Sequence, residues 1–155
     1  MEHRISKELK RYNYLFGETE SAYHEISRKL GLTDSAISIL YALLESGDAC
    51  PLRDVCRFTG LSKQTVNSAL RKLEGEGALR LEPVGGRNKL VRLTEEGKAL
   101  AERTAGRVLA MEDEIFASWP REDVETYLKL TENYMRALQE KARRMGEDRH
   151  ESHHD

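Results

Sequence analysis

Residues 52–94 read LRDVCRFTGLSKQTVNSALRKLEGEGALRLEPVGGRNKLVRLT, and the predicted fold class follows from the patterns in this segment. Near its start, the tetrapeptide Thr59-Gly60-Leu61-Ser62 separates two segments of helical periodicity. Gly60 permits the positive φ that a tight bend between crossed helices often needs, and the Ser62 hydroxyl can accept a hydrogen bond from a free backbone N–H of the next helix. The stretch therefore predicts a short helix, a turn and a second helix.

The second predicted helix has one apolar and one polar face. Its apolar residues are spaced three and four apart, which places them on one side of a helix: Val66, Ala69, Leu70 and Leu73. The other side carries donors and acceptors that suit base edges and phosphates. Together with the residues of the helix start, they are the predicted DNA-binding set: Ser62, Lys63, Gln64, Thr65, Asn67, Ser68 and Arg71.

The helix before the turn is expected to support the second helix and to contact the DNA backbone. Its spacing predicts Leu52, Val55 and Phe58 on the inner side. Arg53 and Arg57 are predicted to point outward.

A β-hairpin is predicted directly after the second helix, which ends near Gly77. Residues 79–82 and 90–93 alternate between apolar and polar side chains, and Pro83-Val84-Gly85-Gly86 separates them. Arg87 and Lys89 follow the tip and join the predicted DNA-binding set, with Arg87 directed at the minor groove. The predicted fold class is mainly α with a small β-hairpin wing: a winged helix-turn-helix.

Charge is segregated along the chain. Residues 50–93 hold nine Lys or Arg and four Asp or Glu, a net charge of +5, whereas the whole chain carries −2. An acidic protein with one basic face is suited to binding a polyanion through that face. The alternative is that these Lys and Arg side chains form only a water-exposed helical surface that binds no partner.

Long amphipathic helices are expected on both sides of this segment. One is predicted over residues 5–30 and a second from Thr33 or Asp34 to Gly47; after the hairpin, one helix runs from Thr94 to Trp119-Pro120 and a last one starts at Glu122. Their apolar stripes predict a homodimer, with an intramolecular core as the alternative. The predicted organisation is an N-terminal dimerisation helix (1–32), a DNA-binding lobe (33–97), C-terminal dimerisation helices (98–145) and a disordered tail (146–155).

Composition favours a binding protein rather than an enzyme. The 155 residues contain no apolar run long enough to span a bilayer and no signal-peptide stretch, which predicts a cytoplasmic protein without membrane contact. No nucleophile is spaced with a base or a metal triad, so no catalysis, metal or cofactor is predicted. Cys50 and Cys56 are expected to be small buried side chains, and a thiol-based redox sensor is the alternative.

Two motifs resemble the multiple-antibiotic-resistance regulator (MarR) family of bacterial transcription factors. They are LSKQTVN at 61–67 leading to LRKLE at 70–74, and RNKLVRLTEEG at 87–97. The resemblance covers roughly residues 5–143 and implies a homodimeric, ligand-responsive regulator, commonly a repressor. In that family an arginine matching Arg87 contacts the minor groove, often braced by an Asp two positions earlier; here Gly85 stands in that place, which leaves Arg87 less ordered.

The resemblance also implies a small aromatic or phenolic effector that binds between the dimer helices and the DNA-binding lobe. The candidate residues for that site are Tyr12, Phe16, Tyr23, His24 and Tyr41. The alternative for the aromatic residues is ordinary packing in a core. Dimeric helix-turn-helix proteins bind half-sites about one helical turn apart, so a roughly palindromic operator is expected. The competing function is a winged-helix protein-interaction module without DNA binding.

Overall fold

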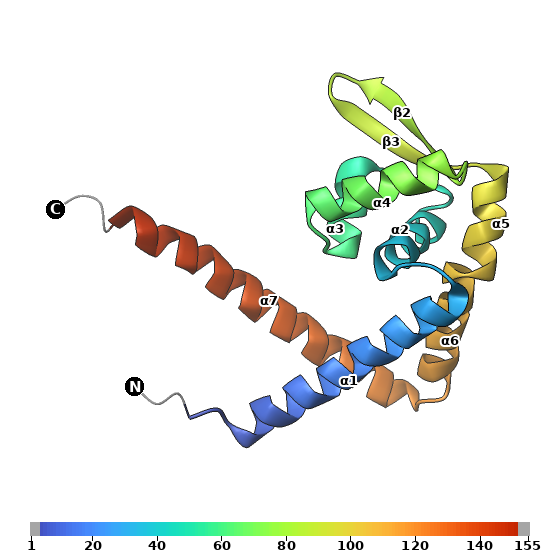
Figure 1. Cartoon of the computed structure of the whole chain (residues 1–155). Helices are drawn as coiled ribbons and strands as arrows, with labels where there is room; N and C mark the ends of the chain where they lie inside the picture. The colour runs from blue at the N-terminus through green and yellow to red at the C-terminus, as the bar shows by residue number, and fades with distance from the viewer. Residues whose placement is uncertain (1–3, 152–155) are drawn as a thin grey trace. The chain divides into compact units, whose positions relative to one another are not determined.

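The computed structural model describes residues 4–151, with side chains described up to residue 146. The helices and strands follow one another in the order α1 (Lys7–Leu30), α2 (Asp34–Glu45), β1 (Ala49–Pro51), α3 (Leu52–Thr59), α4 (Lys63–Gly75), β2 (Leu79–Gly85), β3 (Asn88–Leu93), α5 (Glu95–Arg103), α6 (Ala105–Ala117) and α7 (Arg121–Glu151). This mainly helical chain with one small sheet confirms the predicted fold class (Figure 1). Over the described residues, no helix is both long and apolar enough to cross a membrane.

Hydroxyl side chains define where four of the helices begin. Each accepts a hydrogen bond from a backbone N–H three residues later, at 3.0 to 3.2 Å, which satisfies a donor that the first turn leaves free: Ser6 for α1, Thr33 for α2, Ser62 for α4 and Thr94 for α5. The predicted starts at Thr33, Ser62 and Thr94 are confirmed. The cap at Ser6 was not predicted.

The core lies around α2, which packs against α3, α4, α5 and the sheet. The largest fully buried side chains belong to α2, α3, α4 and the two longer strands: Ile39, Leu40, Leu43, Val55, Val66, Leu70, Leu73, Leu79 and Val91. The predicted apolar face of the second helix is therefore confirmed at Val66, Leu70 and Leu73, and Ala69 is partly buried against the same cluster.

The sheet has three antiparallel strands in the order β1-β3-β2. β2 and β3 form the predicted hairpin, with Leu79 opposite Leu93 and Leu81 opposite Val91. β1 was not predicted, because three residues are too few for an alternating pattern. Its Cys50 pairs with Val91 in the middle strand, so β1 covers the edge of β3 that does not pair with β2.

Two sequence predictions in this region are wrong. Phe58 is 60% exposed rather than inward, because α3 is short and buries the side centred on Val55 and Thr59, about a quarter-turn or more away from Phe58. The helix predicted from Thr94 to Trp119 is interrupted at buried Thr104, which leaves helical geometry with φ −121° and ψ −88°. The Thr104 hydroxyl donates to the Leu100 carbonyl at 2.6 Å, a local bond that competes with helix continuation.

The chain divides into two compact units, Met1–Met111 and Glu112–Asp155. In the second unit, the turn between α6 and α7 is packed by three aromatic rings, Phe116, Trp119 and Tyr127, whose centroids lie 5.4 to 6.1 Å apart. α7 continues to Glu151 and so runs through part of the tail, 146–155, that was expected to be disordered. Apart from Gly146, its last residues are compatible with a helix. Residues 152–155 of the expected tail lie outside the described part of the chain.

Candidate nucleic-acid interface

The turn between α3 and α4 fixes the start of α4 through local hydrogen bonds. Gly60 has φ 65° and donates its N–H to the Cys56 carbonyl at 3.1 Å, closing α3 in the left-handed geometry that favours glycine. The Thr59 hydroxyl donates to the Val55 carbonyl at 2.8 Å. Ser62 then accepts from the Thr65 N–H at 3.2 Å. The turn therefore spans three residues, Gly60 to Ser62, and local hydrogen bonds fix both the end of α3 and the start of α4.

The outer face of α4 brings the predicted DNA-binding side chains together. Lys63, Gln64, Ser68 and Arg71 are exposed and Asn67 is partly buried between them. The same five residues line a shallow hollow of about 490 Å³. The hydroxyls of Ser62 and Thr65 lie 2.8 Å apart at the helix start, where they complete the cap.

The wing projects from the lobe beside α3 and α4, as Figure 1 shows. Its tip turns through Gly85 and Gly86, whose φ values of 117° and 58° favour glycine, and the register shifts between Pro83 and Gly85. Arg87 and Lys89 are exposed at this tip. Gly85 carries no carboxylate, so the backbone turn alone positions Arg87 from that side.

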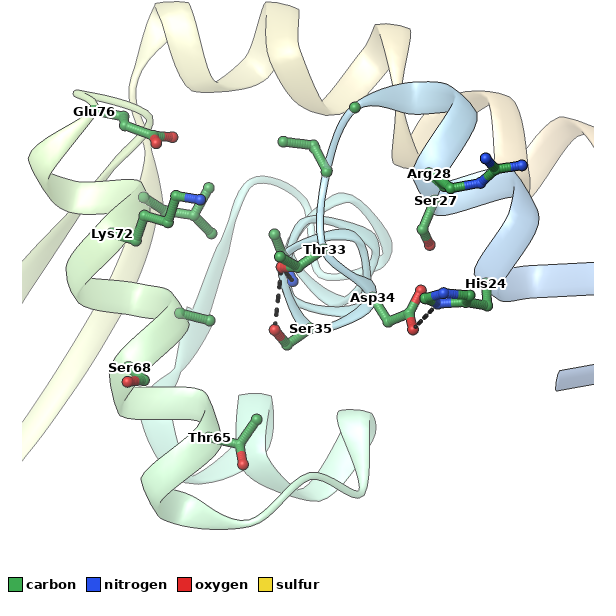
Figure 2. A pocket seen from close by; sticks show the side chains of 15 residues that line it. His24, Ser27, Arg28, Thr33, Asp34, Ser35, Thr65, Ser68, Lys72 and Glu76 are labelled. Carbon is green, nitrogen blue, oxygen red and sulfur yellow. Dashed lines mark hydrogen bonds and ion pairs between the residues drawn. The ribbon is translucent and has the colours of Figure 1, made fainter. Parts of the chain in front are cut away.

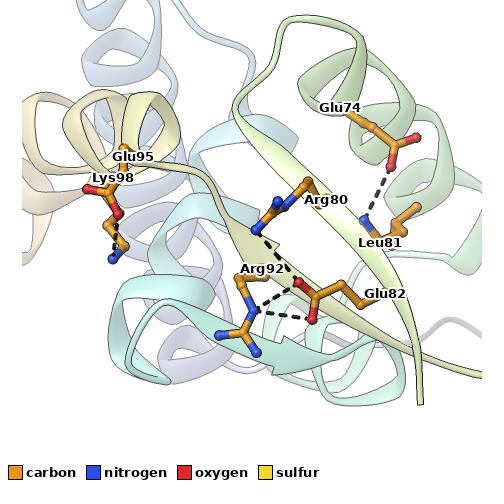
Figure 3. A network of polar contacts seen from close by, with 7 residues as sticks. All are labelled: Glu74, Arg80, Leu81, Glu82, Arg92, Glu95 and Lys98. Carbon is orange, nitrogen blue, oxygen red and sulfur yellow. Dashed lines mark hydrogen bonds and ion pairs between the residues drawn. The ribbon is translucent and has the colours of Figure 1, made fainter.

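The base of the wing is held by a carboxylate between two arginines (Figure 3). Arg80 and Arg92 are direct partners across the strands, a placement in which like charges repel. Glu82 offsets this by accepting from Arg92 Nε at 3.1 and 3.2 Å and lying 3.9 Å from Arg80 Nη2. Glu74 of α4 accepts from the Leu81 N–H at 3.3 Å, which joins the wing to the end of α4.

A cleft of about 500 Å³ lies where α3, the start of α4 and the wing meet; we call it the wing cleft. It is lined by Pro51, Leu52, Arg53, Cys56, Lys63, Val84, Arg87, Asn88 and Lys89. Sequence reasoning assigned Lys63, Arg87 and Lys89 to one function but did not predict that Arg53 and Asn88 line the same space, since these residues come from separate elements.

A second cavity, of about 610 Å³, lies between the end of α1, the start of α2 and the side of α4; we call it the α1–α4 pocket (Figure 2). Its apolar lining includes Leu32, Ala36, Ala69 and Leu73, and its charged lining is Arg28, Asp34, Lys72 and Glu76 together with His24. Ser68 lines both this pocket and the hollow on the outer face of α4.

One wall of the α1–α4 pocket is made by a pair that joins α1 to α2. His24 Nδ1 lies 2.8 Å from Asp34 Oδ2, although both side chains are more than half exposed. The hydrogen bond from His24, followed by one from Ser27, lowers the pKa of the Asp34 carboxyl below its ordinary value. Asp34 therefore stays ionised at the first position of α2, where a negative charge also suits the helix dipole.

The sequence-predicted effector residues are distributed over two regions. His24 lines the α1–α4 pocket. Tyr12 and Phe16 stack on the exposed face of α1 with ring centroids 6.1 Å apart, and Tyr23 is 39% exposed on the same helix. Tyr41 packs against the core from α2. The four aromatic residues do not line this pocket.

The two cysteines differ in environment. Cys50 is buried in β1 and burial raises the pKa of its thiol, which disfavours the reactive thiolate. Cys56 is partly buried and lines the wing cleft. Among the described side chains, no group of three or more His, Cys, Asp or Glu is arranged to hold a metal ion.

These features define a winged helix-turn-helix with long helices on either side, and known proteins share them. Residues 30–87 match the model of the MarR family. Among solved structures, the MarR-family regulator NMB1585 from Neisseria meningitidis has a TM-score of 0.74 at 22% identity, covering 88% of this chain and 96% of its own. No curated protein sequence matches the chain.

Two further similar structures have names that mention DNA or a small molecule. MepR from S. aureus, solved as a DNA complex, has a TM-score of 0.67 at 18% identity and covers 87% of this chain and 99% of its own. BpsR from Bordetella bronchiseptica, whose DNA binding is regulated by 6-hydroxynicotinic acid, has a TM-score of 0.62 at 23% identity, covering 81% and 98%. The family match over the helix-turn-helix and the shared fold over most of its length make this chain similar to MarR-family regulators.

Proposed function

We propose that this protein is a homodimeric regulator of transcription that binds a pseudo-palindromic operator in double-stranded DNA. The observation that carries the proposal is the outer face of α4, where Lys63, Gln64, Asn67, Ser68 and Arg71 lie together around one hollow. Amide side chains pair with adenine in the major groove, and Lys or Arg pair with guanine or phosphates. The core fixes this helix rigidly from behind, which suits a helix that has to enter a groove.

The wing supports the same function. Arg87 and Lys89 extend beyond α4 on a hairpin whose base is fixed by Glu82. We assign Arg87 to the minor groove next to the major groove that α4 enters, because a narrow minor groove concentrates negative potential. Lys89 is assigned to the phosphates.

Dimerisation is proposed from exposed apolar side chains on the outer helices. On α1 and just before it, Ile5, Leu9, Leu15 and Phe16 are 44 to 55% exposed. α7 carries a similar set at 42 to 61%: Tyr127, Leu128, Leu130, Tyr134, Met135 and Leu138. Exposed apolar surface of this extent marks an interaction site, and a second copy of the chain covers both helices symmetrically.

The experiment that tests DNA binding is selection of bound sequences from random duplexes, followed by salt titrations on the selected site and on a scrambled one. Neutralising several phosphates makes affinity fall steeply with ionic strength. Gln64→Ala and Asn67→Ala are expected to relax base preference. Arg87→Ala is expected to lower the affinity for selected and scrambled duplexes alike. Glu122→Ala, at an exposed position of α7, serves as the control and is expected to leave both affinities unchanged.

Two results would count against the proposal. If Gln64→Ala and Asn67→Ala lowered the affinity for both duplexes equally, these residues of α4 would not recognise specific bases. A wild-type chain without salt-dependent binding to any duplex would favour the alternative, a protein-interaction module.

We further propose that a small aromatic or phenolic effector controls this regulator and that it acts as a repressor released by the effector. The α1–α4 pocket supports this, because it combines an apolar floor with polar groups and is large enough for a small ligand. Titration with 6-hydroxynicotinic acid and 4-hydroxyphenylacetate, followed by thermal shift and by DNA release, tests it. Ala69→Leu, which fills the floor, should abolish the response, while Ala99→Leu at an exposed site of α5 retains it. A response that survives Ala69→Leu would move the effector site to the aromatic set Tyr12, Phe16, Tyr23 and Tyr41.

A further inference from the structure

The wing has one free edge, which β2 provides. In the sheet order β1-β3-β2, β3 pairs on both sides and β2 pairs on one side only. Backbone groups alternate in direction along an antiparallel strand, so every second N–H of β2 points away from β3. The Ala78 carbonyl faces β3, because it accepts from the Thr94 N–H at 3.1 Å. Leu81 and Pro83, each an odd number of positions further along, therefore lie at outward-facing positions.

Neither of these two outward positions has an unsatisfied donor. Pro83 has no backbone N–H. The Leu81 N–H donates to Glu74 Oε2 of α4 at 3.3 Å (Figure 3). An open strand edge can pair with another chain, and a covering side chain prevents this. The contact therefore protects the edge of the wing and also attaches the wing to α4.

Glu74 makes this contact from an electrostatically unfavourable position. It lies in the last turn of α4, where the helix dipole disfavours a negative charge. The end of α4 is already joined to the base of the wing, where the Ala78 N–H donates to the Leu73 carbonyl at 2.9 Å. Leu81 lies further along β2, toward the tip. A hairpin held at one point can tilt about it, whereas a second attachment fixes the tilt.

The tilt matters because the wing is long. From Ala78 to Gly85 at the tip, the seven residues of β2 span at most about 23 Å, at about 3.3 Å per residue. At that length, a rotation of about 10° around the base would move the tip by about 4 Å. Hydrogen bonds to bases and phosphates require donor–acceptor distances of about 2.7–3.2 Å, so such a movement would break a contact made by Arg87.

We propose that Glu74 is a positioning residue for the wing. By holding the edge of β2 at Leu81, it sets the distance between α4 and Arg87, so that the helix and the wing tip reach adjacent grooves of one duplex. The inference rests on the proposed function and deepens it. Glu74 acts through the backbone of β2 and does not itself contact DNA.

The test measures the fold loss of affinity that Arg87→Ala causes on the selected duplex in four backgrounds. Glu74→Ala removes the acceptor, so we expect this loss to be about threefold or more smaller there than in the wild type. Glu74→Gln keeps an acceptor oxygen without the charge and should retain the wild-type loss. Glu102→Ala is the charge-matched control at an exposed position of α5, and it should also retain the wild-type loss.

A second measurement tests the contact without DNA. The amide of Leu81 should exchange with solvent faster in Glu74→Ala than in the wild type or in Glu74→Gln, as followed by NMR. The amide of Leu93, which donates to the Asp48 carbonyl at 2.9 Å, should exchange equally in all three proteins. Unchanged exchange at Leu81 in Glu74→Ala would overturn the proposal.

The affinities distinguish a failed positioning role from a failed proposed function. A wild type that binds no duplex overturns the proposed function, while exchange at Leu81 still reports the Glu74 contact. If the wild type binds but Arg87→Ala costs nothing, the assignment of Arg87 fails, and the positioning role fails with it. If Arg87→Ala costs the same in Glu74→Ala as in the wild type, only the positioning role is overturned. Equal gains of affinity in Glu74→Ala and Glu74→Gln, with that cost unchanged, would show that Glu74 acts only by repelling phosphates.

Discussion

The hydroxyl of Thr94 donates to the carbonyl oxygen of Gly77 at 2.6 Å and accepts from the Gly97 N–H at 3.0 Å. One side chain therefore closes the loop after α4 and caps the start of α5. The Thr94 N–H adds a bond to the Ala78 carbonyl at 3.1 Å. The end of α4, the beginning of the wing and the first turn of α5 are joined at this point.

Thr94→Val is expected to lower the free energy of unfolding by about 1–2 kcal/mol, because it removes a helix cap and a partly buried hydrogen bond while preserving shape. Urea unfolding followed by circular dichroism measures the loss. Thr94→Ser keeps the hydroxyl and should lie close to the wild type. Equal midpoints for the valine and serine variants would show that this hydroxyl does not stabilise the fold.

Gly97 and Gly75 are expected to respond in opposite ways to alanine. A Cβ at Gly97 would lie 1.6 Å from the Ala78 carbonyl oxygen, so α5 would have to move away from the end of α4. We expect Gly97→Ala to cost about 2–3 kcal/mol or more. A Cβ at Gly75 meets open space within α4, and Gly75→Ala should add about 0.5–1 kcal/mol. Thermal unfolding of both variants makes the comparison, and a tolerated Gly97→Ala would refute the close contact.

The two thiols are expected to react in sequence with iodoacetamide. Cys50 is 1% exposed and its raised pKa disfavours the thiolate, so it should react only when the chain unfolds. Cys56 is partly exposed in the wing cleft and should react first. Mass spectrometry of the native and the urea-unfolded protein gives the order. If Cys50 and Cys56 were modified at the same rate in the native protein, Cys50 would not be buried in solution.

The His24–Asp34 pair is expected to make stability depend on acid pH. Because the folded pKa of Asp34 is lowered, its contribution is complete above the ordinary carboxyl pKa of 3.8 and is lost as the pH falls through the lower folded value. His24→Gln removes the largest cause of that shift. NMR titration of the Asp34 carboxyl should show a higher pKa in His24→Gln than in the wild type, with a smaller change in Ser27→Ala. An unchanged pKa of Asp34 in His24→Gln would show that the two side chains do not form this hydrogen bond in solution.

Deletion of residues 121–155 is expected to dissociate the proposed dimer, since it removes the apolar surface of α7. Sedimentation velocity measures the change. A finer pair of variants is Leu128→Asp and Lys129→Asp, which place the same side chain at neighbouring exposed positions of α7, the first in place of an apolar residue and the second in place of a charged one. The first should weaken dimerisation and the second should leave it intact. A truncated chain that sediments as a dimer would assign the interface to other helices.

Local patterns in the sequence were sufficient for the helix-turn-helix and the hairpin. Gly60 and Ser62 bond to neighbours within five residues, and so does the N–H of Gly77, so these roles follow from sequence spacing alone. The faces of α4 could likewise be predicted from helical periodicity. The family resemblance added nothing to these elements that the residues did not already indicate.

The features that escaped prediction depend on contacts between distant residues. β1 is a strand only because the edge of β3 is available to residues 49–51. Thr104 breaks a continuous amphipathic pattern through one side-chain hydrogen bond. The wing cleft and the α1–α4 pocket each combine residues from three or more elements, so no spacing rule predicts that Arg53 and Arg87 line one cavity, or that Lys72 and His24 line another.

Ser68 lines both the α1–α4 pocket and the outer face of α4. A molecule in the pocket and a duplex on the outer face would therefore contact the same turn of one helix from two sides. Thermodynamic linkage is reciprocal, so an effector that weakens operator binding by a given factor must itself bind the operator-bound form more weakly by the same factor. The concentration at which such a regulator responds would then shift with the number of operator copies that compete for it.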